Sequence, residues 1–497
     1  MYNSYIKMYK FKPVCSFIND LYNNDANVID TEHELWVNIK NVREQSNLIF
    51  IGVYDGTHIK PFQLIIDIEK NPELEDFRGK LHTGAYIKVK GKIVKSPAKG
   101  QTIEMLVTSL NLEGSIRDTN SYLPLVKGVN LDILRGKNSY LRPKFQTYQA
   151  VYTIVDKVDQ FVNDFMRNIN FKKIDPNILS LSECEGAGEM FVVTNMLKDD
   201  IKEVPVLPNG KIDYSKDFFN KKVGLTVSSQ LQLEALCPMG KGVYTMNKSF
   251  RAEKSKTSRH LCEFTHFEFE TRLINTVEDL MNFEEDLITN IIKRTLVECK
   301  DELESLNSFV SKGIVNRLEG FVKEDFARTS YTNAVDIITR DVENIKKIYE
   351  LNDSDIPKWG DDLGGKCERY LAEHIFKKPV FVYNYPLELK SFYMKQNKPD
   401  ENSRLTVGAV DLLIPNLGEL IGSSLRENDY DKLVNEMDRR QMDKSSLQWY
   451  IDLRKNGSMS TAGAGVGMNR LWQMLCYMDS NIRDVTPFAV SFEECYF

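Results

Sequence analysis

The chain has 497 residues, a net charge of −6, 42% apolar and 27% charged residues, a composition typical of a soluble globular protein with two or three domains. The acidic balance excludes a global basic field, so a nucleic-acid partner would need local basic patches. Eight scattered cysteines without a C-x-x-C pair argue against a zinc site or a disulfide framework, and no apolar run approaches the ~20 residues of a membrane span, so we expect a cytoplasmic protein with no membrane partner.

Residues 30–115 are predicted to form short strands separated by turns. Segment 86–95 alternates apolar residues with lysines, the period-two pattern of a half-buried strand. We expect five strands, near 35–39, 48–53, 63–66, 86–95 and 103–107. Five short strands in a segment of this length favour a small β-barrel, of which the OB-fold is the best-known example, and such barrels bind single-stranded nucleic acid.

The rest of the chain mixes helical and strand patterns and is predicted to be an α+β domain. The polar segment 119–139 is expected to link the two domains, which gives boundaries of 1–118 and 140–497. Apolar residues at three- and four-residue spacing predict helices at 145–168 and 276–310. We further expect a loop-rich insertion at 198–222, a strand at 406–414 and a helix at 466–478.

Two polar motifs point to chemistry. Residues 249–264 contain Arg251 and end in Phe264, and the small-residue run 463–470 ends in Arg470. Arginine forks pair with phosphate oxygens, glycines let a backbone approach a ligand, and an aromatic ring offers a stacking face to adenine. Together the two motifs predict a site for a bent, polyanionic nucleotide.

Four stretches, in order, resemble motifs of the class II aminoacyl-tRNA synthetases of the aspartate/asparagine/lysine subgroup, and within it the asparaginyl enzymes. Residues 140–144 with Pro176 are similar to the family's first motif, 249–264 to its second, 463–470 to its third, and 411–426 to its metal and substrate segment. The resemblance covers about residues 30–488. It implies an OB-fold that binds the tRNA anticodon, an antiparallel catalytic sheet flanked by helices, and a homodimer with Pro176 at its interface.

The resemblance also implies a reaction in which asparagine and ATP form an adenylate, with Mg²⁺ as cofactor, and the aminoacyl group then passes to tRNA. Such chemistry depends on alignment and charge neutralisation. Arg251 and Arg470 are the implied catalytic residues. The implied ATP-binding residues are Arg251, Glu253, Arg259, His260, Phe264, Glu419, Gly467 and Arg470, and the implied metal ligands are Asp411 and Glu419. Taken singly, Arg251 and Glu253 also fit a surface pair, and His260 a structural histidine.

The choice of amino acid depends on the segment around Leu233. Aspartate-specific relatives carry lysine at this position, and a carboxamide needs one donor and one acceptor instead of a second cation. By resemblance, Glu234 accepts from the asparagine amide and Arg426 donates to its oxygen. The implied amino-acid-binding residues are Glu185, Ser228, Gln230, Glu234 and Arg426, with Glu185 and Gln230 holding the α-ammonium group.

In the predicted barrel, the resemblance implies that Arg43, Phe50 and Gln63 contact the anticodon. Phe50 also fits plain barrel core. Lys88, Lys90 and Lys92 share a strand face, which suits either phosphate contact or a solvated surface.

The chain departs from the family pattern at two places near the third motif. Thr461 stands where the asparaginyl enzymes usually have histidine, and Asn469 where they usually have glutamate. Two alternatives therefore stay open at this point: an aspartyl enzyme of relaxed specificity, and an inactive synthetase-like RNA-binding protein. An asparagine-making paralogue fits poorly, because such proteins lack the barrel.

Overall fold

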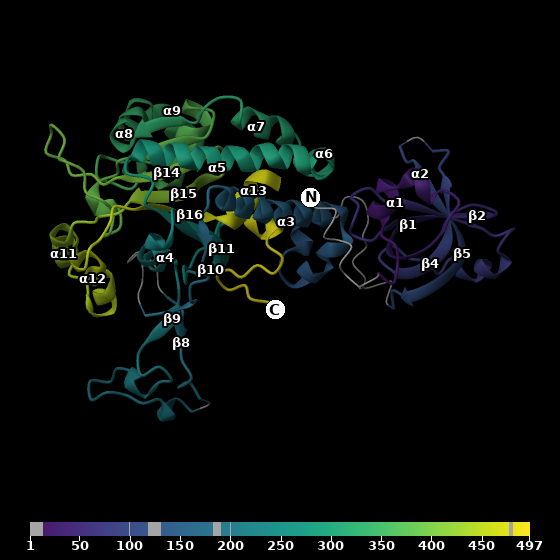
Figure 1. Ribbon diagram of the computed structural model, residues 1–497, viewed down its shortest axis with the longest axis horizontal. Helices are drawn as coiled ribbons and strands as arrows, with labels where there is room; N and C mark the ends of the chain where they lie inside the picture. Colours follow the sequence, from purple (N-terminus) through teal and green to yellow (C-terminus); the bar gives the residue numbers. More distant parts are fainter. Residues whose placement is uncertain (1–12, 99, 118–130, 182–189, 199, 477–480) are drawn as a thin grey trace. The chain divides into compact units, whose positions relative to one another are not determined.

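The computed structural model describes residues 13–98, 100–117, 131–181, 190–198, 200–476 and 481–497. The chain divides into two compact units, Met1–Ala150 and Val151–Phe497. Figure 1 labels the elements in chain order. The predicted Glu185 and most of the predicted linker lie outside the described residues.

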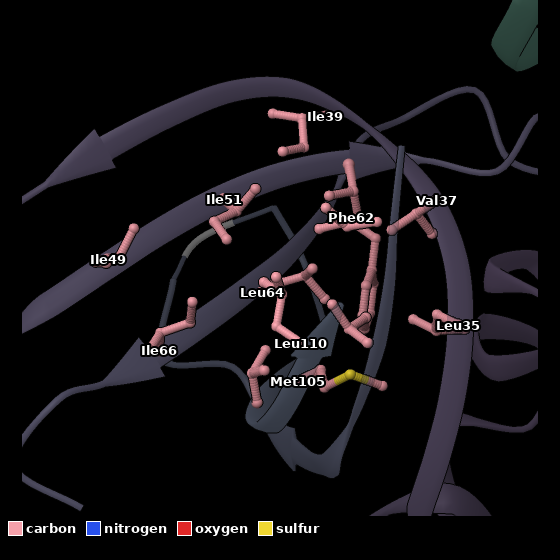
Figure 2. Close-up of a cluster of buried hydrophobic side chains, with 14 of the residues drawn as sticks. Leu35, Val37, Ile39, Ile49, Ile51, Phe62, Leu64, Ile66, Met105 and Leu110 are labelled. Atoms are coloured by element: carbon pink, nitrogen blue, oxygen red, sulfur yellow. The ribbon is translucent and has the colours of Figure 1, made fainter. Parts of the chain in front are cut away.

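The first unit contains a closed five-stranded barrel, which confirms the predicted OB-fold. Its strands pair in the order β1-β2-β3-β5-β4. The bounds are β1 Glu32–Glu44, β2 Leu48–Tyr54, β3 Phe62–Asp67, β4 Tyr86–Lys95 and β5 Ile103–Gly114, and the short helices α1 Ile18–Asn23 and α2 Asp25–Val28 precede them. Alternate residues of each strand fill the interior, as Figure 2 shows for Ile49 and Ile51 of β2 and Leu64 and Ile66 of β3.

The second unit is built on an eight-stranded sheet with the order β12-β13-β14-β15-β16-β11-β10-β6. Neighbouring strands are antiparallel except for the pairs β12–β13 and β10–β6. The bounds are β6 Lys172–Lys173, β10 Gly242–Phe250, β11 Glu263–Thr271, β12 Ala327–Ser330, β13 Val380–Tyr383, β14 Ala409–Ile414, β15 Gly418–Leu425 and β16 Ala462–Gly467. This arrangement confirms the predicted α+β class.

Helices flank the sheet, and α5 packs against β14 and β15. Figure 1 shows α5 running along this unit. The helices are α3 Gln146–Asn168, α4 Gln230–Leu236, α5 Val277–Glu298, α6 Lys300–Phe309, α7 Ile314–Phe321, α8 Tyr331–Arg340, α9 Val342–Tyr349, α10 Gly364–Tyr370, α11 Tyr430–Arg439, α12 Gln448–Lys455 and α13 Met468–Cys476.

The single helix predicted over 276–310 is wrong. The backbone leaves helical values at Cys299, with φ −119° and ψ 32°, and a second helix begins at Lys300. Both α5 and α6 pack on α7, and each buries an apolar stripe. The amphipathic pattern could not reveal this break, because both helices bury the same kind of face.

Two further boundaries differ from the prediction. Val466 and Gly467 belong to β16, and the helix predicted from 466 begins at Met468. The strand predicted from 406 begins at Ala409. Segment 200–222 holds the short 3₁₀ turns Ile201–Glu203 and Tyr214–Lys216 and an isolated bridge between Val206 and Ile212, as the loop-rich prediction expects.

A small three-stranded sheet lies beside this insertion. It pairs β7 Leu179–Ser180, β9 Val223–Leu225 and β8 Val192–Val193 in the order β7-β9-β8. Figure 1 shows β8 and β9 extending away from the large sheet. The seven described cysteines are free thiols, and no described helix is long and apolar enough to cross a membrane.

Candidate active site

Strand β16 forms the floor of the site because it lies between β15 and β11. A Cβ at Gly463 would lie 1.9 Å from Glu270 Oε2, and a Cβ at Gly465 would lie 2.5 Å from His266 Nε2. At these two positions glycine therefore makes room for side chains of the neighbouring strand, a role that the motif alone does not suggest.

A cavity opens at the C-terminal end of β16. A Cβ at Gly467 would meet only the side chain of Arg470, at 3.9 Å, so glycine keeps this edge open. Every residue predicted to bind ATP lines the cavity, although these residues come from separate parts of the chain: Arg251, Glu253, Arg259, His260, Phe264, Glu419, Gly467 and Arg470. The structure thus brings together the whole predicted nucleotide set.

Three arginines converge on this cavity. Arg251 follows β10, and its guanidinium lies 5.5 Å from the ring centroid of Phe264. Arg470 belongs to α13 and donates to the backbone carbonyl of Glu419 at 2.7 Å. Arg259, in the loop before β11, donates to a backbone carbonyl at 3.0 Å. These backbone contacts fix the guanidinium groups of Arg470 and Arg259, so their remaining N–H groups are pre-oriented for phosphate oxygens.

The crowding of cations perturbs two groups in the cavity. Burial, followed by the charges of Arg369 and Arg470, lowers the pKa of Arg259. Burial and the same Arg470 lower the pKa of His260, whose Nδ1 lies 3.0 Å from Ser255 Oγ. A bound polyanion would relieve this repulsion and raise both pKa values again, and a ring N–H of His260 can donate a hydrogen bond to a phosphate in either protonation state.

A second cavity adjoins the first. Three of the residues predicted to bind the amino acid line it: Ser228, Gln230 and Arg426. Arg251 and Glu419 line both cavities. The two cavities therefore share a wall, and a group bound in one is held next to a group bound in the other.

Arg426 is fixed at the bottom of the second cavity by a buried ion pair. Its Nε and Nη2 donate to the carboxylate of Glu270 at 3.0 Å, and its Nη1 donates to Ser424 Oγ at 2.6 Å. The guanidinium also lies 5.4 Å from the ring centroid of Tyr393. Burial raises the pKa of Glu270, and Arg426 opposes this shift. Glu270 was not predicted from the sequence.

Glu268 is a second acidic residue that the sequence reasoning missed. It accepts from Ser228 Oγ and from the backbone N–H of Ser229, the latter at 2.9 Å, and it lines the second cavity. The available signal was the alternation of Glu268 and Glu270 in a strand, which places both carboxylates on one face. A carboxylate beside Gln230 suits an ammonium group.

Glu234 does not line either cavity. Its carboxylate is buried and accepts from the hydroxyl of Tyr450 and from Nη2 of Arg454. Both partners belong to α12, more than 200 residues along the chain. The direct substrate contact implied by the resemblance therefore stays a prediction.

Asp411 and Glu419 flank a position without a side chain. A Cβ at Gly422 would lie 3.1 Å from Glu419 Oε1 and 3.8 Å from Asp411 Oδ1, so glycine leaves open the space between the two carboxylates. Lys390 Nζ donates to Asp411 Oδ2 at 2.5 Å. Burial and the charges of Glu419 and Asp411 raise the pKa of Glu368 to about 8. Hard oxygen donors in an acidic setting fit Mg²⁺, which binds through one or two carboxylates plus substrate phosphates.

The two departures from the family pattern both touch this site. The backbone carbonyl of Thr461 accepts from the backbone N–H of Arg426 at 2.9 Å. Asn469 is buried and lines the first cavity. Neither substitution displaces a predicted arginine.

The predicted anticodon residues share the outer surface of β1, β2 and β3. Arg43 lies directly opposite Phe50 in the β1–β2 pairing, and Gln63 lies opposite Gly52 in the β2–β3 pairing. Phe50 is half-buried and alternates with core residues, so it points out of the barrel and is not part of the core. The barrel thus presents an aromatic face beside a cation and an amide.

The lysine face of β4 is largely neutralised by acidic residues. Lys88 pairs with Glu34 at 3.2 Å, and Lys92 pairs with Asp30 at 2.9 Å. These partly or fully exposed pairs favour the solvated-surface interpretation over direct phosphate contact.

Pro176 lies ahead of an exposed apolar segment. Its carbonyl accepts from Asn247 Nδ2 at 3.1 Å. Ile178, Leu179 and Leu181 follow with 37%, 44% and 48% of their surface exposed. Such a run next to a fixed proline is a candidate contact for another chain.

Comparison with known proteins gives consistent matches over almost the whole length. Residues 132–491 match the family model of tRNA synthetases class II (D, K and N), and residues 36–113 match the OB-fold nucleic acid binding domain. The Asparagine--tRNA ligase of Photobacterium profundum is 37% identical, with 89% of this chain and 91% of the relative covered. The Asparagine--tRNA ligase of Acetivibrio thermocellus is 36% identical, with 95% of this chain and 97% of the relative covered. The asparaginyl-tRNA synthetase of Pyrococcus horikoshii, solved with asparaginyl-adenylate, superposes with a TM-score of 0.81 at 27% identity, covering 98% of this chain and all of that one.

Proposed function

Because this chain belongs to the class II tRNA synthetases of the D, K and N group, we propose that it ligates asparagine to tRNA through an asparaginyl-adenylate. ATP is the second substrate and is converted to AMP and pyrophosphate. Both relatives are named Asparagine--tRNA ligase, and the structural relative was solved with asparaginyl-adenylate. These matches support asparagine over aspartate as the amino-acid substrate.

The observation that carries the proposal is the wall shared by the two cavities. Arg251 and Glu419 line both, the first cavity contains three arginines, and the second ends in the Arg426–Glu270 pair. This arrangement supports the proposal that an amino-acid carboxylate binds beside the α-phosphate of ATP. Holding two reactants in this way turns a bimolecular step into an effectively unimolecular one.

In the first step, a carboxylate oxygen of asparagine attacks the α-phosphorus, and the bond to pyrophosphate breaks. Arg251 binds the α-phosphate and the carboxylate together and neutralises the charge that develops between them. Arg259 and His260 bind the outer phosphates, and Phe264 and Arg470 hold adenine between an aromatic face and a guanidinium. Asp411 and Glu419 would hold Mg²⁺, which, when bound, neutralises phosphate charge.

The second cavity selects the amino acid. The α-ammonium group binds to Gln230, Glu268 and Glu185. Arg426 donates to the side-chain carbonyl, and Glu234 accepts from the amide N–H. An acidic acceptor at this end disfavours aspartate, whose carboxylate would face a second negative charge.

We further propose that the barrel binds the anticodon through Arg43, Phe50 and Gln63. Stacking of a base on Phe50 is tolerant of sequence, while Gln63 offers a donor and an acceptor that can discriminate. The predicted cytoplasmic location stays a prediction.

We also propose a homodimer that forms through the region of Pro176. The exposed apolar residues of 178–181 support this proposal. Sedimentation equilibrium tests it: the wild type is expected at twice the chain mass, and Leu179→Asp is expected to shift the equilibrium toward monomer. A monomeric wild type at micromolar concentration would contradict the dimer.

The experiment that tests the proposed function is ATP–pyrophosphate exchange with each amino acid in turn. Exchange with asparagine and not with aspartate or lysine is the expected result. Exchange with aspartate would instead support a relaxed aspartyl enzyme. No exchange with any amino acid, from a folded protein that still binds tRNA, would support an inactive RNA-binding protein.

A further inference from the structure

Glu234 is held by two side chains of one helix. Its carboxylate accepts from the Tyr450 hydroxyl and from Arg454 Nη2, and Tyr450 and Arg454 are four residues apart on α12. Arg454 is itself fixed: its Nε donates to the carbonyl of Glu427 at 3.0 Å, and its guanidinium lies 4.0 Å from the Tyr450 ring centroid. The Arg454 side chain is only 1% exposed, so this is a fully desolvated ion pair.

The position of Glu234 connects this ion pair to the second cavity. Gln230, one turn earlier on α4, lines that cavity, and residues four apart lie on the same face of a helix. The helix packs on β11 and β16. The charge of Glu234 also acts on Glu270 and Arg426 at the closed end of the cavity. Glu234 therefore lies one turn behind Gln230, toward the Arg426–Glu270 pair.

The ion pair leaves Glu234 able to accept from further donors. A carboxylate has about four acceptor positions, and Tyr450 and Arg454 occupy one on each oxygen. A buried carboxylate is stable only when paired, and its orientation follows the geometry of its partners. The planar fork of arginine fixes that orientation, whereas a lysine at the same place would supply only a point charge.

We propose that Arg454, supported by Tyr450, is a positioning residue that sets the selectivity of the second cavity for asparagine over aspartate. Arg454 orients Glu234 so that its free acceptor position faces the substrate carboxamide. The inference rests on the proposed function and extends it, because it assigns a selectivity role to α12, which lies outside both cavities.

The test is ATP–pyrophosphate exchange with Arg454→Lys, Arg454→Met and Tyr450→Phe, measured with asparagine and with aspartate. We expect Arg454→Met to raise the KM for asparagine by about ten- to a hundredfold, the range found for residues that orient metal ligands. The KM for ATP should change less than about twofold, and the preference for asparagine should fall by at least about tenfold. Arg454→Lys should recover part of the loss, and Tyr450→Phe, which removes one hydrogen bond, should cost about tenfold or less.

Arg439→Met is the matched control. Arg439 lies on α11, pairs with Glu436 at 2.7 Å and is 45% exposed, and neither residue lines the two cavities, so its loss removes an arginine–glutamate pair without removing a lining residue. It should leave both KM values unchanged.

Three outcomes would overturn the inference. Equal rises in the two KM values, or a fall in kcat with an unchanged preference for asparagine, would show that Arg454 only supports the fold. If Arg454→Met does not fold, the decision rests on Tyr450→Phe and Arg454→Lys, and unchanged selectivity in both would overturn it. A wild type that shows no asparagine-dependent exchange would instead overturn the proposed function.

Discussion

The backbone N–H of Thr265 on β11 donates to Oδ1 of Asn469 at 2.9 Å, although the two residues are 204 positions apart. Asn469 Nδ2 donates in turn to Thr486 Oγ1 at 2.8 Å. The amide thus joins the strand of the second motif, the helix of the third motif and the C-terminal segment. The family usually has glutamate at this position. Asn469 is neutral and offers one acceptor and two donors, and the two bonds use both the acceptor and a donor.

Asn469→Ala should therefore destabilise the second unit. The substitution leaves the Thr265 N–H without its acceptor, at a cost of about 1–3 kcal/mol, and it removes a donor to Thr486 Oγ1, whose hydroxyl still donates to the Ile482 carbonyl. We expect a lower urea midpoint in near-ultraviolet circular dichroism. Asn469→Asp keeps the acceptor, so its urea midpoint should fall less. Equal midpoints for the wild type and Asn469→Ala would contradict this role of Asn469.

Arg251→Gln should lower kcat for pyrophosphate exchange by about a hundredfold or more, because it removes a cation aimed at the reacting charge. Arg251 lines both cavities, whereas Arg259 lines only the first. Arg259→Gln should accordingly raise the KM for ATP and leave the KM for asparagine unchanged. An Arg251 variant that alters only the KM for ATP would show that the shared wall has no role in alignment.

Glu419→Gln should raise the Mg²⁺ concentration for half-maximal exchange by about tenfold, because it replaces a carboxylate donor beside Gly422. Chelation of divalent ions should abolish exchange. Glu253→Gln changes a carboxylate in the same cavity that is predicted to contact ATP but not the metal, and its Mg²⁺ dependence should match that of the wild type. If both variants shift equally, the effect arises from net charge and not from ligation.

Phe50→Ala should weaken the binding of tRNA without affecting the formation of the adenylate. Loss of one stacked base costs about 1–3 kcal/mol, so the KM for tRNA should rise between about 5- and 150-fold while pyrophosphate exchange stays constant. Tyr86→Ala removes another aromatic residue of the barrel, 45% exposed on β4, and should leave the KM for tRNA unchanged. Similar effects of the two substitutions would argue against a specific anticodon face.

Glu284 predicts a pH dependence of stability. It is fully buried in α5, and burial, reinforced by the charge of Asp411, raises the pKa of its carboxyl to about 8. Between the unfolded pKa near 4.5 and about 8, the folded state holds a proton that the unfolded state releases, so stability falls as pH rises through this range. The slope contributed by this group is at most about 1.4 kcal/mol per pH unit.

Glu284→Gln should remove that slope. The difference in thermal midpoint between the variant and the wild type should grow from pH 6 to pH 8 and then level off. Glu319→Gln, an exposed change on α7, should give a constant difference. A Glu284→Gln difference that does not vary with pH would show that the carboxyl is not protonated in the folded protein.

Much of the barrel could be predicted from sequence, because its strands alternate with period two and are bounded by turn residues. Segment 86–95 was predicted with the bounds that the structure shows. The nucleotide residues could also be predicted, since their spacing in two motifs carries the signal. The strand β16 could not: its glycines have low strand propensity, and pairing with β11 and β15 decides its conformation.

The ion-pair partners of the predicted site residues could not be predicted from the sequence. Glu270 pairs with Arg426 across 156 positions, and Arg454 pairs with Glu234 across 220. No local pattern marks such pairs, because each depends on which strands and helices become neighbours. The same limit applies to the break at Cys299, where tertiary packing and not propensity separates the two helices.

The central place of β16 has a consequence for biosynthesis. It is the last strand of the large sheet in chain order, yet it fills the gap between β11 and β15. While the ribosome is still making earlier segments, the nascent chain holds two partial sheets, each with an unpaired edge able to capture another polypeptide. Shielding by a chaperone would be most valuable in that interval, and a chain terminated before residue 462 would keep both edges open permanently.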